Sequence, residues 1–238
     1  RVQEGKFIVE GKKLVQEGLN SEFSPEIVIV TDEFFKQNKE FMEFVKKRSI
    51  IERIANEDVE RLSDTNTPQG IFAIFDKKDV DLEFKADSVI IGLENINDPG
   101  NIGTIIRNSD WFGIKEIYLS TGCAEIYNPK TIRSSMGSIF HINFYEEIRF
   151  VDHIKYLQSQ GYVCFSTDLE GENLYNFTFP EKSFIIFSNE ANGPAKDVLN
   201  AVDKRLNIPK FGSAESLNVA SASAVIISEI SRRKLFGK

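Results

Sequence analysis

The sequence predicts an α/β protein with a largely parallel sheet, on three observations. Beyond residue 80, several short segments are apolar at both odd and even positions, as expected of strands covered on both faces. Amphipathic segments with helical spacing lie between them, which predicts a doubly wound arrangement. Of the 238 residues, 41% are hydrophobic and 27% are charged, a composition typical of a globular protein rather than a disordered or fibrous one.

The first 80 residues alternate strand and helix patterns. One longer helix is expected from Glu33 to Arg48, where Phe34, Phe41 and Phe44 recur at helical spacing. The other expected elements are strands at 7–9, 26–30 and 71–75 and a short helix at 56–62. Segment 76–81 is highly charged and has no periodicity, so we expect a domain boundary near residue 80.

The remaining residues, 81–238, continue the alternation and are expected to form a second, larger domain. The expected strands are 89–93, 116–119, 162–165, 184–187 and 205–208. The expected helices are 103–112, 148–160 and 217–235. The last of these is apolar on nearly all sides, so we expect it to be buried, either within the chain or against a second copy.

Charge, cysteine content and hydropathy exclude several classes of protein. The 29 basic and 36 acidic residues give a net charge of −7, so any RNA-binding surface must be local. Cys123 and Cys164 form no C-x-x-C pair, which argues against a disulfide scaffold or a zinc site. No apolar run approaches the ~20 residues of a membrane helix. Without a signal segment we expect a cytoplasmic protein, and without an initiating Met we expect residues before Arg1.

Sequence fingerprints of common cofactors are missing. The strand at 89–93 leads to Asn97-Asp98-Pro99-Gly100-Asn101, which does not match the G-x-G-x-x-G dinucleotide loop, and no P-loop pattern occurs. His141 lies in an apolar run and His153 on an amphipathic helix, so structural roles are expected for both. A small-molecule enzyme of the α/β class therefore has no fingerprint to support it.

Three loops, each after an expected strand, carry the polar residues best placed for chemistry. The first contains Asn101, expected to cap the following helix, and Arg107. The second places Glu190 among the small residues of segment 188–194, and the third, 208–219, enters a helix rich in Ala, Ser, Val and Ile. Each loop alone could be an ordinary turn or helix cap. Together the three loops form a pattern of polar residues in a fixed order along the chain.

That pattern resembles motifs one, two and three of the SpoU (TrmH-type) RNA ribose 2′-O-methyltransferases of the SPOUT superfamily. The matching residues are Asn101 to Arg107 as N-x-G-x-x-x-R, Glu190, Ile208-Pro209, and Ser216-Leu217-Asn218-Val219. Residues 6–11 and 67–70 are similar to the ribosomal-protein-like RNA-binding module of the same family. The resemblance therefore extends over nearly the whole chain.

The resemblance implies a fold, a reaction and a set of site residues. It implies a SPOUT catalytic domain at 81–238 with a C-terminal trefoil knot, preceded by an RNA-binding domain at 1–80 that lacks its N-terminal start. It also implies S-adenosylmethionine as cofactor, rRNA or tRNA as substrate and a homodimer. The implied catalytic residues are Asn101, Arg107, Glu190, Ser216 and Asn218, and the implied cofactor-binding residues are Ser188, Gly193, Ile208, Pro209 and Leu217.

Chemistry narrows the expected role of Arg107. Family precedent assigns it activation of the 2′-hydroxyl, but a guanidinium stays protonated, so we expect it to grip phosphate and stabilise the forming alkoxide. We expect no metal, because the loops lack a cluster of His, Cys or carboxylates. Ser188 and Ala191 replace glycines common in motif two. A catalytically silent RNA-binding member of the same fold therefore stays the alternative.

Overall fold

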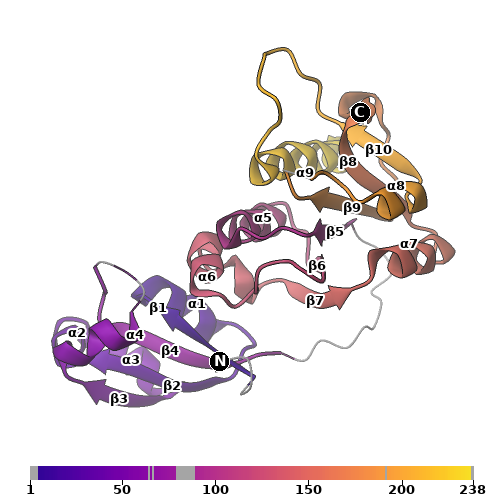
Figure 1. The fold of residues 1–238 in the computed structure, drawn as a ribbon. Coiled ribbons are helices and arrows are strands. Elements are labelled where there is room, and N and C mark those ends of the chain that lie inside the picture. Colours follow the sequence, from indigo (N-terminus) through magenta and orange to yellow (C-terminus); the bar gives the residue numbers. More distant parts are fainter. Residues whose placement is uncertain (1–4, 64, 66, 79–88, 191, 237–238) are drawn as a thin grey trace.

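The computed structural model describes residues 5–63, 65, 67–78, 89–190 and 192–236. They form two sheets (Figure 1): a four-stranded sheet in residues 5–78, called the N-terminal part, and a six-stranded sheet in residues 89–236, called the C-terminal part. The boundary expected near residue 80 lies outside the described residues.

The N-terminal part is a mixed sheet with short helices. Its strands are β1 (Lys6–Glu10), β2 (Pro25–Thr31), β3 (Ile50–Ile54) and β4 (Ile71–Asp76). Its helices are α1 (Lys12–Asn20), α2 (Asp32–Gln37), α3 (Lys39–Lys46), the 3₁₀ turn η2 (Asn56–Asp58) and α4 (Val59–Leu62). In the order β1-β4-β2-β3, strand β4 pairs antiparallel with both β1 and β2, and β3 lies at the edge, parallel to β2.

The single helix expected from Glu33 to Arg48 was wrong, because the chain breaks there into α2 and α3. At the break, the Asn38 Nδ2 donates to the Phe34 carbonyl at 3.1 Å, and the Lys12 Nζ donates to the Asn38 Oδ1 at 2.9 Å. An Asn side chain that bonds to the backbone competes with helix continuation. The edge strand β3 was missed, since only Ile51 and Ile54 are partly buried and Glu52 and Arg53 interrupt its apolar residues.

The C-terminal part is a sheet of parallel strands, as the sequence predicted. Its strands are β5 (Val89–Glu94), β6 (Glu116–Ser120), β7 (Asn143–Ile148), β8 (Val163–Asn173), β9 (Ser183–Ser188) and β10 (Lys204–Asn207). Its helices are α5 (Pro99–Trp111), α6 (Pro129–Ser135), α7 (Phe150–Ser159), α8 (Lys196–Ala201) and α9 (Val219–Phe236), with 3₁₀ turns η3 (Ser138–Phe140) and η4 (Leu174–Asn176). Strand β7 and helices α1, α6 and α8 were not among the expected elements.

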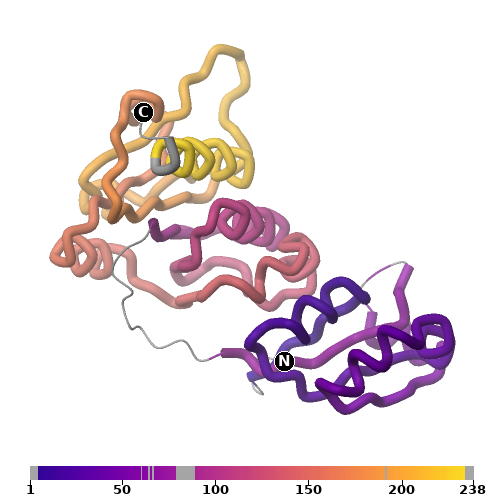
Figure 2. Tube along the Cα trace, turned by 180° about the vertical axis from the view of Figure 1, so that it is seen from behind, coloured from indigo at the N-terminus to yellow at the C-terminus, as the bar shows by residue number. Residues whose placement is uncertain are grey.

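Helices cover both faces of this sheet, which explains why its strands are apolar at every position. Ile91 and Ile185 belong to the core beneath α5, α6 and α9, whereas Ile90 and Phe184 belong to a second cluster with α7 and α8. Both views show α9 beside α5 on one side of the sheet (Figures 1 and 2). The Asn108 Nδ2 joins the two helices by donating to the Ala220 carbonyl at 3.1 Å and the Ser223 Oγ at 3.0 Å.

An aromatic cluster joins the two parts. The Phe7 ring of β1 stacks on Tyr127 with 4.4 Å between centroids, and Phe140 of η3 packs edge-on against Phe23 and Phe75 at 5.4 and 5.5 Å. His141 lies beside this cluster. Its Nδ1 is 2.9 Å from a carboxylate oxygen of Asp110, and its Nε2 is 3.9 Å from a carboxylate oxygen of Glu17 in α1. The two parts therefore share one core, and His141 lies exposed beside it, in contact with Asp110.

Two features of the described residues bear on the excluded classes. None of their helices combines the length and the apolar character needed to cross a bilayer. Both cysteines are free, and burial raises the pKa of the Cys164 thiol to about 12.

Candidate active site

Two polar loops meet where the strand order of the C-terminal part reverses. The sheet order is β10-β8-β9-β5-β6-β7, so the chain moves to one side of β5 for β6 and β7 and to the other side for the later strands. Glu94 ends β5 and Ser188 ends β9, and the two are direct partners in the register. Open parallel sheets bind ligands beyond the carboxyl ends of strands at such a reversal. The loops after Glu94 and Ser188 therefore form the candidate site.

The first loop ends in a well-capped helix. The Asn101 backbone N–H donates to the Asp98 Oδ1 at 2.9 Å, and Pro99 occupies the first position of α5. Asp98, and not Asn101 as expected, is therefore the cap. The Lys130 Nζ lies 2.7 Å from the other Asp98 oxygen, and this hydrogen bond lowers the pKa of the Asp98 carboxyl. The Asn101 side chain is thereby available for another contact.

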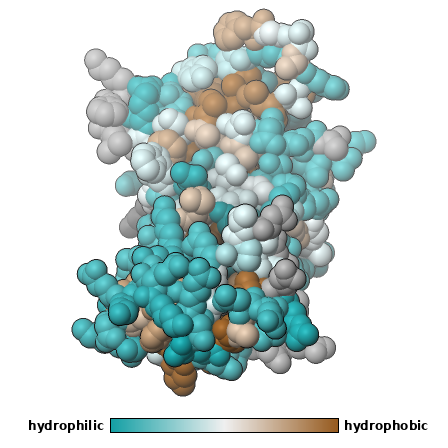
Figure 3. All heavy atoms as spheres, turned by 90° about the vertical axis from the view of Figure 1, so that its left-hand side faces the viewer, coloured by the Kyte–Doolittle hydropathy of each residue, from teal (hydrophilic) through white to brown (hydrophobic). Residues whose placement is uncertain are grey.

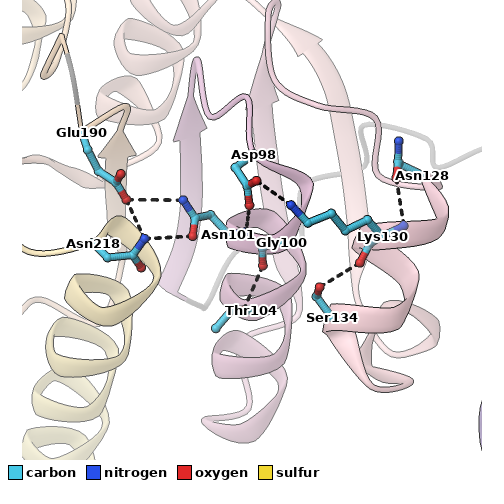
Figure 4. A network of polar contacts seen from close by, with 9 residues as sticks. All are labelled: Asp98, Gly100, Asn101, Thr104, Asn128, Lys130, Ser134, Glu190 and Asn218. Carbon is cyan, nitrogen blue, oxygen red and sulfur yellow. Dashed lines mark hydrogen bonds and ion pairs between the residues drawn. The ribbon is translucent and has the colours of Figure 1, made fainter. Parts of the chain in front are cut away.

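That contact is a polar network that joins all three loops (Figure 4). The Asn218 Nδ2 donates to the Glu190 Oε1 at 2.9 Å and to the Asn101 Oδ1 at 3.0 Å. The Asn101 Nδ2 lies 3.4 Å from the same Glu190 oxygen, which also accepts the Val219 N–H at 2.5 Å. A carboxylate at the N-terminus of a long helix such as α9 is electrostatically favourable. Three predicted site residues, 89 and 28 positions apart in sequence, thus form one cluster.

Arg107 is not part of this cluster. It follows Asn101 by six residues in α5, a rotation of about 240° around the helix axis, so it faces a different direction. Its side chain is exposed. Among the described carboxylates, none lies within ion-pair distance of its guanidinium, which is therefore free to contact a ligand.

The third loop, between β10 and α9, projects from the rest of the molecule in both views (Figures 1 and 2). Ser216 and Leu217 are exposed, Leu217 to 49%, and Phe211 to 97%. Ile208 and Pro209 at its start are half-buried, and Ile208 packs against the core. The structure therefore brings Asn218 to the network and leaves Ser216 and Leu217 facing solvent.

Both ends of the second loop donate hydrogen bonds to one buried carboxylate, that of Glu94. The Ser188 Oγ donates to the Glu94 Oε2 at 2.7 Å, and the Ala195 N–H points to both oxygens of the same carboxylate at 3.3 and 3.4 Å. Gly193 has φ +62°, and a Cβ there would meet nothing within 4 Å, so the space beside the loop is open. Ala191 lies outside the described residues.

Glu94 and Lys130 were not anticipated from the sequence. Glu94 is a lone carboxylate at the end of an apolar strand, and Lys130 lies 32 residues beyond the Asp98 that it contacts. The signal available for Glu94 was its position next to motif one, because a charged residue that ends a fully buried strand needs partners. Lys130 had no such signal.

The fold defines a doubly wound α/β protein with a candidate ligand site at its strand reversal, and comparisons with known proteins identify its family. The model of the SpoU rRNA Methylase family matches residues 88–228, and that of the MRM3-like substrate binding domain matches residues 1–73. The chain belongs to the SpoU rRNA methylase family.

Relatives of known activity and solved structures agree with this. The chain is 30% identical to the 23S rRNA (guanosine(2553)-2′-O)-methyltransferase RlmP of Bacillus subtilis, over 95% of this chain and 89% of that protein. It is 26% identical to the 23S rRNA (uridine(2479)-2′-O)-methyltransferase of Streptomyces viridochromogenes, over 100% and 86%. A TrmH-family structure from Porphyromonas gingivalis superposes with a TM-score of 0.86 at 32% identity, covering 98% of this chain and 92% of that one.

Proposed function

We propose that this protein transfers a methyl group from S-adenosylmethionine to a ribose 2′-hydroxyl of structured RNA, either rRNA or tRNA. The observation that carries the proposal is the network of Asn101, Glu190 and Asn218 at the strand reversal, where the three family motifs meet. The two relatives named above methylate a ribose 2′-oxygen of 23S rRNA. A catalytically silent chain would not need these three side chains to converge.

The residues present fit S-adenosylmethionine. The SpoU methyltransferase AviRb, whose structure was solved with AdoMet, shares this fold with a TM-score of 0.91 at 24% identity. Here the second loop offers open space beside Gly193, and the residues of the third loop are exposed from Lys210 to Asn218. We propose that Ser188, Gly193, Ile208, Pro209 and Leu217 bind the cofactor, mostly through backbone groups. Among the described residues, no three His, Cys, Asp or Glu cluster as metal ligands, and we propose that no metal takes part.

The bound cofactor would supply a sulfonium methyl group for in-line attack by the ribose oxygen. The chain must then orient the ribose and stabilise the charge that forms on its oxygen. We propose that Asn101, Glu190, Ser216 and Asn218 position the nucleotide. The exposed guanidinium of Arg107 would donate to the adjacent phosphate and to the forming alkoxide, and the proton would leave to phosphate or water.

We also propose a homodimer through α5 and α9. Most apolar residues of α9 are already buried in the same chain, so they do not by themselves require a partner. Trp111, however, is 83% exposed one helical turn after Arg107, and Val225 of α9 is 36% exposed. Seen from the left-hand side of Figure 1, hydrophobic atoms gather on the C-terminal part, whereas the N-terminal part below is mostly hydrophilic (Figure 3). A second copy placed against Trp111 and Val225 would cover the Trp111 side chain and bring Arg107 to a complete site.

We propose separate roles for the two parts of the chain and a C-terminal knot. We propose that the N-terminal part binds RNA and that the C-terminal part catalyses, with the boundary near residue 80. The chain returns from the edge strand β10 to place α9 beside α5 and β9, a path that supports a trefoil knot. We propose the cytoplasm as the location.

Calorimetry with S-adenosylmethionine, followed by methyl transfer to rRNA and tRNA and nucleoside mass spectrometry, tests the function. We expect cofactor binding in EDTA and a single 2′-O-methylated nucleotide. RNA binding without cofactor binding would favour the silent alternative. Activity that EDTA abolishes and a divalent ion restores would contradict the metal-free proposal.

A further inference from the structure

The carboxylate of Glu94 is the most enclosed charged group near the candidate site. Its residue is 4% exposed, and Ser188, its partner across the strands, is 8% exposed. Burial raises the pKa of Glu94, while the hydrogen bonds from Ser188 and Ala195 act in the opposite direction and the nearby Asp197 raises it further. A buried carboxylate is costly unless hydrogen bonds satisfy it, so its donors must be held in place.

These donors belong to the two ends of one loop, the segment that joins Ser188 to Ala195. The Ser188 hydroxyl approaches from its first residue, and the Ala195 N–H from its last. The main chain of β5 adds a second tie, because the Asn189 N–H donates to the Glu94 carbonyl at 3.1 Å. Within the loop, the Gly193 N–H donates to the Asn189 carbonyl at 2.9 Å. Both ends of the loop that carries Glu190 are therefore hydrogen-bonded to the Glu94 side chain.

We infer that Glu94 and Ser188 are positioning residues that preset the second loop for S-adenosylmethionine. This inference rests on the proposed function and assigns a part of the cofactor affinity to two side chains that do not touch the polar network. Ser188 occupies a position where glycine is common in motif two, and its hydroxyl supplies the hydrogen bond that glycine would lack. The replacement of glycine by Ser188 thus adds a hydrogen bond that holds the loop.

A preset loop binds its ligand more tightly because less conformational freedom is lost on binding. Removing the Ser188 hydroxyl should therefore weaken S-adenosylmethionine binding even where the protein stays folded. A merely structural role predicts a lower melting temperature and an unchanged dissociation constant at 25 °C. The two readings separate in calorimetry.

The matched control is Ser183→Ala, at the other end of the same strand. Ser183 is fully buried, and its Oγ donates to the Pro180 carbonyl at 2.7 Å. Five residues of strand place it about 16 Å from Ser188. Both alanine variants lose one buried hydroxyl hydrogen bond, so we expect both to lower the melting temperature. Only Ser188→Ala should weaken cofactor binding, by about tenfold, the effect of one hydrogen bond to a charged group.

Glu94→Gln provides a second, independent readout. A glutamine can accept from the Ala195 N–H and donate to the Ser188 Oγ, because a hydroxyl both donates and accepts. We therefore expect only about a threefold loss for Glu94→Gln. The Glu94→Gln/Ser188→Ala double variant should lose less than the product of the two single effects, because both substitutions act on the same hydrogen bond. Amide exchange in the loop should speed up in the same order.

Each result decides one question. If the wild-type protein binds S-adenosylmethionine and Ser188→Ala, Glu94→Gln and the double variant bind it equally well, the inference is wrong and the proposed function stands. If the wild-type protein does not bind S-adenosylmethionine, the proposed function and this inference both fail. Equal weakening by Ser183→Ala would assign the effect to general loss of stability and would also overturn the inference.

Discussion

Asn218 performs two tasks that different substitutions can separate. Its Oδ1 caps α9 by accepting the N–H groups of Ala220 and Ser221 at 3.0 and 3.2 Å. Its Nδ2 donates to Asn101 and Glu190 in the polar network. Serine is also a good N-cap, whereas alanine is not. Asn218→Ser should therefore keep the cap and lose the network, and Asn218→Ala should lose both.

The expected magnitudes follow from these contacts. Loss of an N-cap costs about 1 kcal/mol of unfolding free energy. Loss of the network bonds adds about 1 kcal/mol, since the three side chains are partly or fully exposed and solvent replaces part of each bond. We expect Asn218→Ala to lose about 2 kcal/mol and Asn218→Ser about 1 kcal/mol. Turnover should fall roughly a hundredfold in both, because both misplace the nucleotide.

Urea unfolding measures the first quantity and single-turnover methyl transfer the second. Asn108→Ala is the matched control, because it removes two amide hydrogen bonds between α5 and α9 without touching Glu190. It should lose stability and keep its methyl-transfer rate. Wild-type turnover in Asn218→Ser would refute the positioning role. Equal stability of the two Asn218 variants would refute the cap assignment.

Three further predictions concern Arg107, Trp111 and His153. Arg107→Ala should leave cofactor affinity nearly unchanged. It should raise the activation barrier by ~2.7 to 4 kcal/mol and so lower turnover roughly a hundred- to thousandfold. Arg107→Lys should restore turnover only in part, and loss of cofactor binding in Arg107→Ala would contradict this prediction. Trp111→Glu should convert a dimer to a monomer in sedimentation at micromolar concentration, and a monomeric wild-type protein would exclude the proposed interface. Burial lowers the pKa of His153 to about 4, so the folded state resists protonation and stability falls as the pH drops from about 6.5 towards 4. Urea unfolding at pH 7 and pH 4.5 measures this loss of unfolding free energy. Allowing for partial exposure to solvent, His153→Phe should reduce the loss between the two pH values by about 2 kcal/mol. Equal losses in the wild-type protein and the variant would show that His153 is not the cause.

The sequence by itself determined the α/β class, the parallel sheet and the loops proposed as the site. Strands apolar at both parities, such as β5 and β9, require cover on both faces, and this property is readable without coordinates. The motif residues Asn101, Glu190 and Asn218 were readable because their spacing resembles a known family. Strands without a long apolar run, such as β3 and β7, could not be predicted from the hydrophobic pattern.

Only the tertiary structure decided which polar groups meet. Asn38, between α2 and α3, accepts a hydrogen bond from Lys12, 26 residues earlier, and Asp98 contacts Lys130 of α6. The partnership of Glu94 with Ser188, 94 residues apart, depends on the register of two neighbouring strands. The physical reason is that a local pattern reports which face of an element is buried. Contacts between side chains depend on how separate elements pack, and in this sheet the strand order differs from the order along the chain.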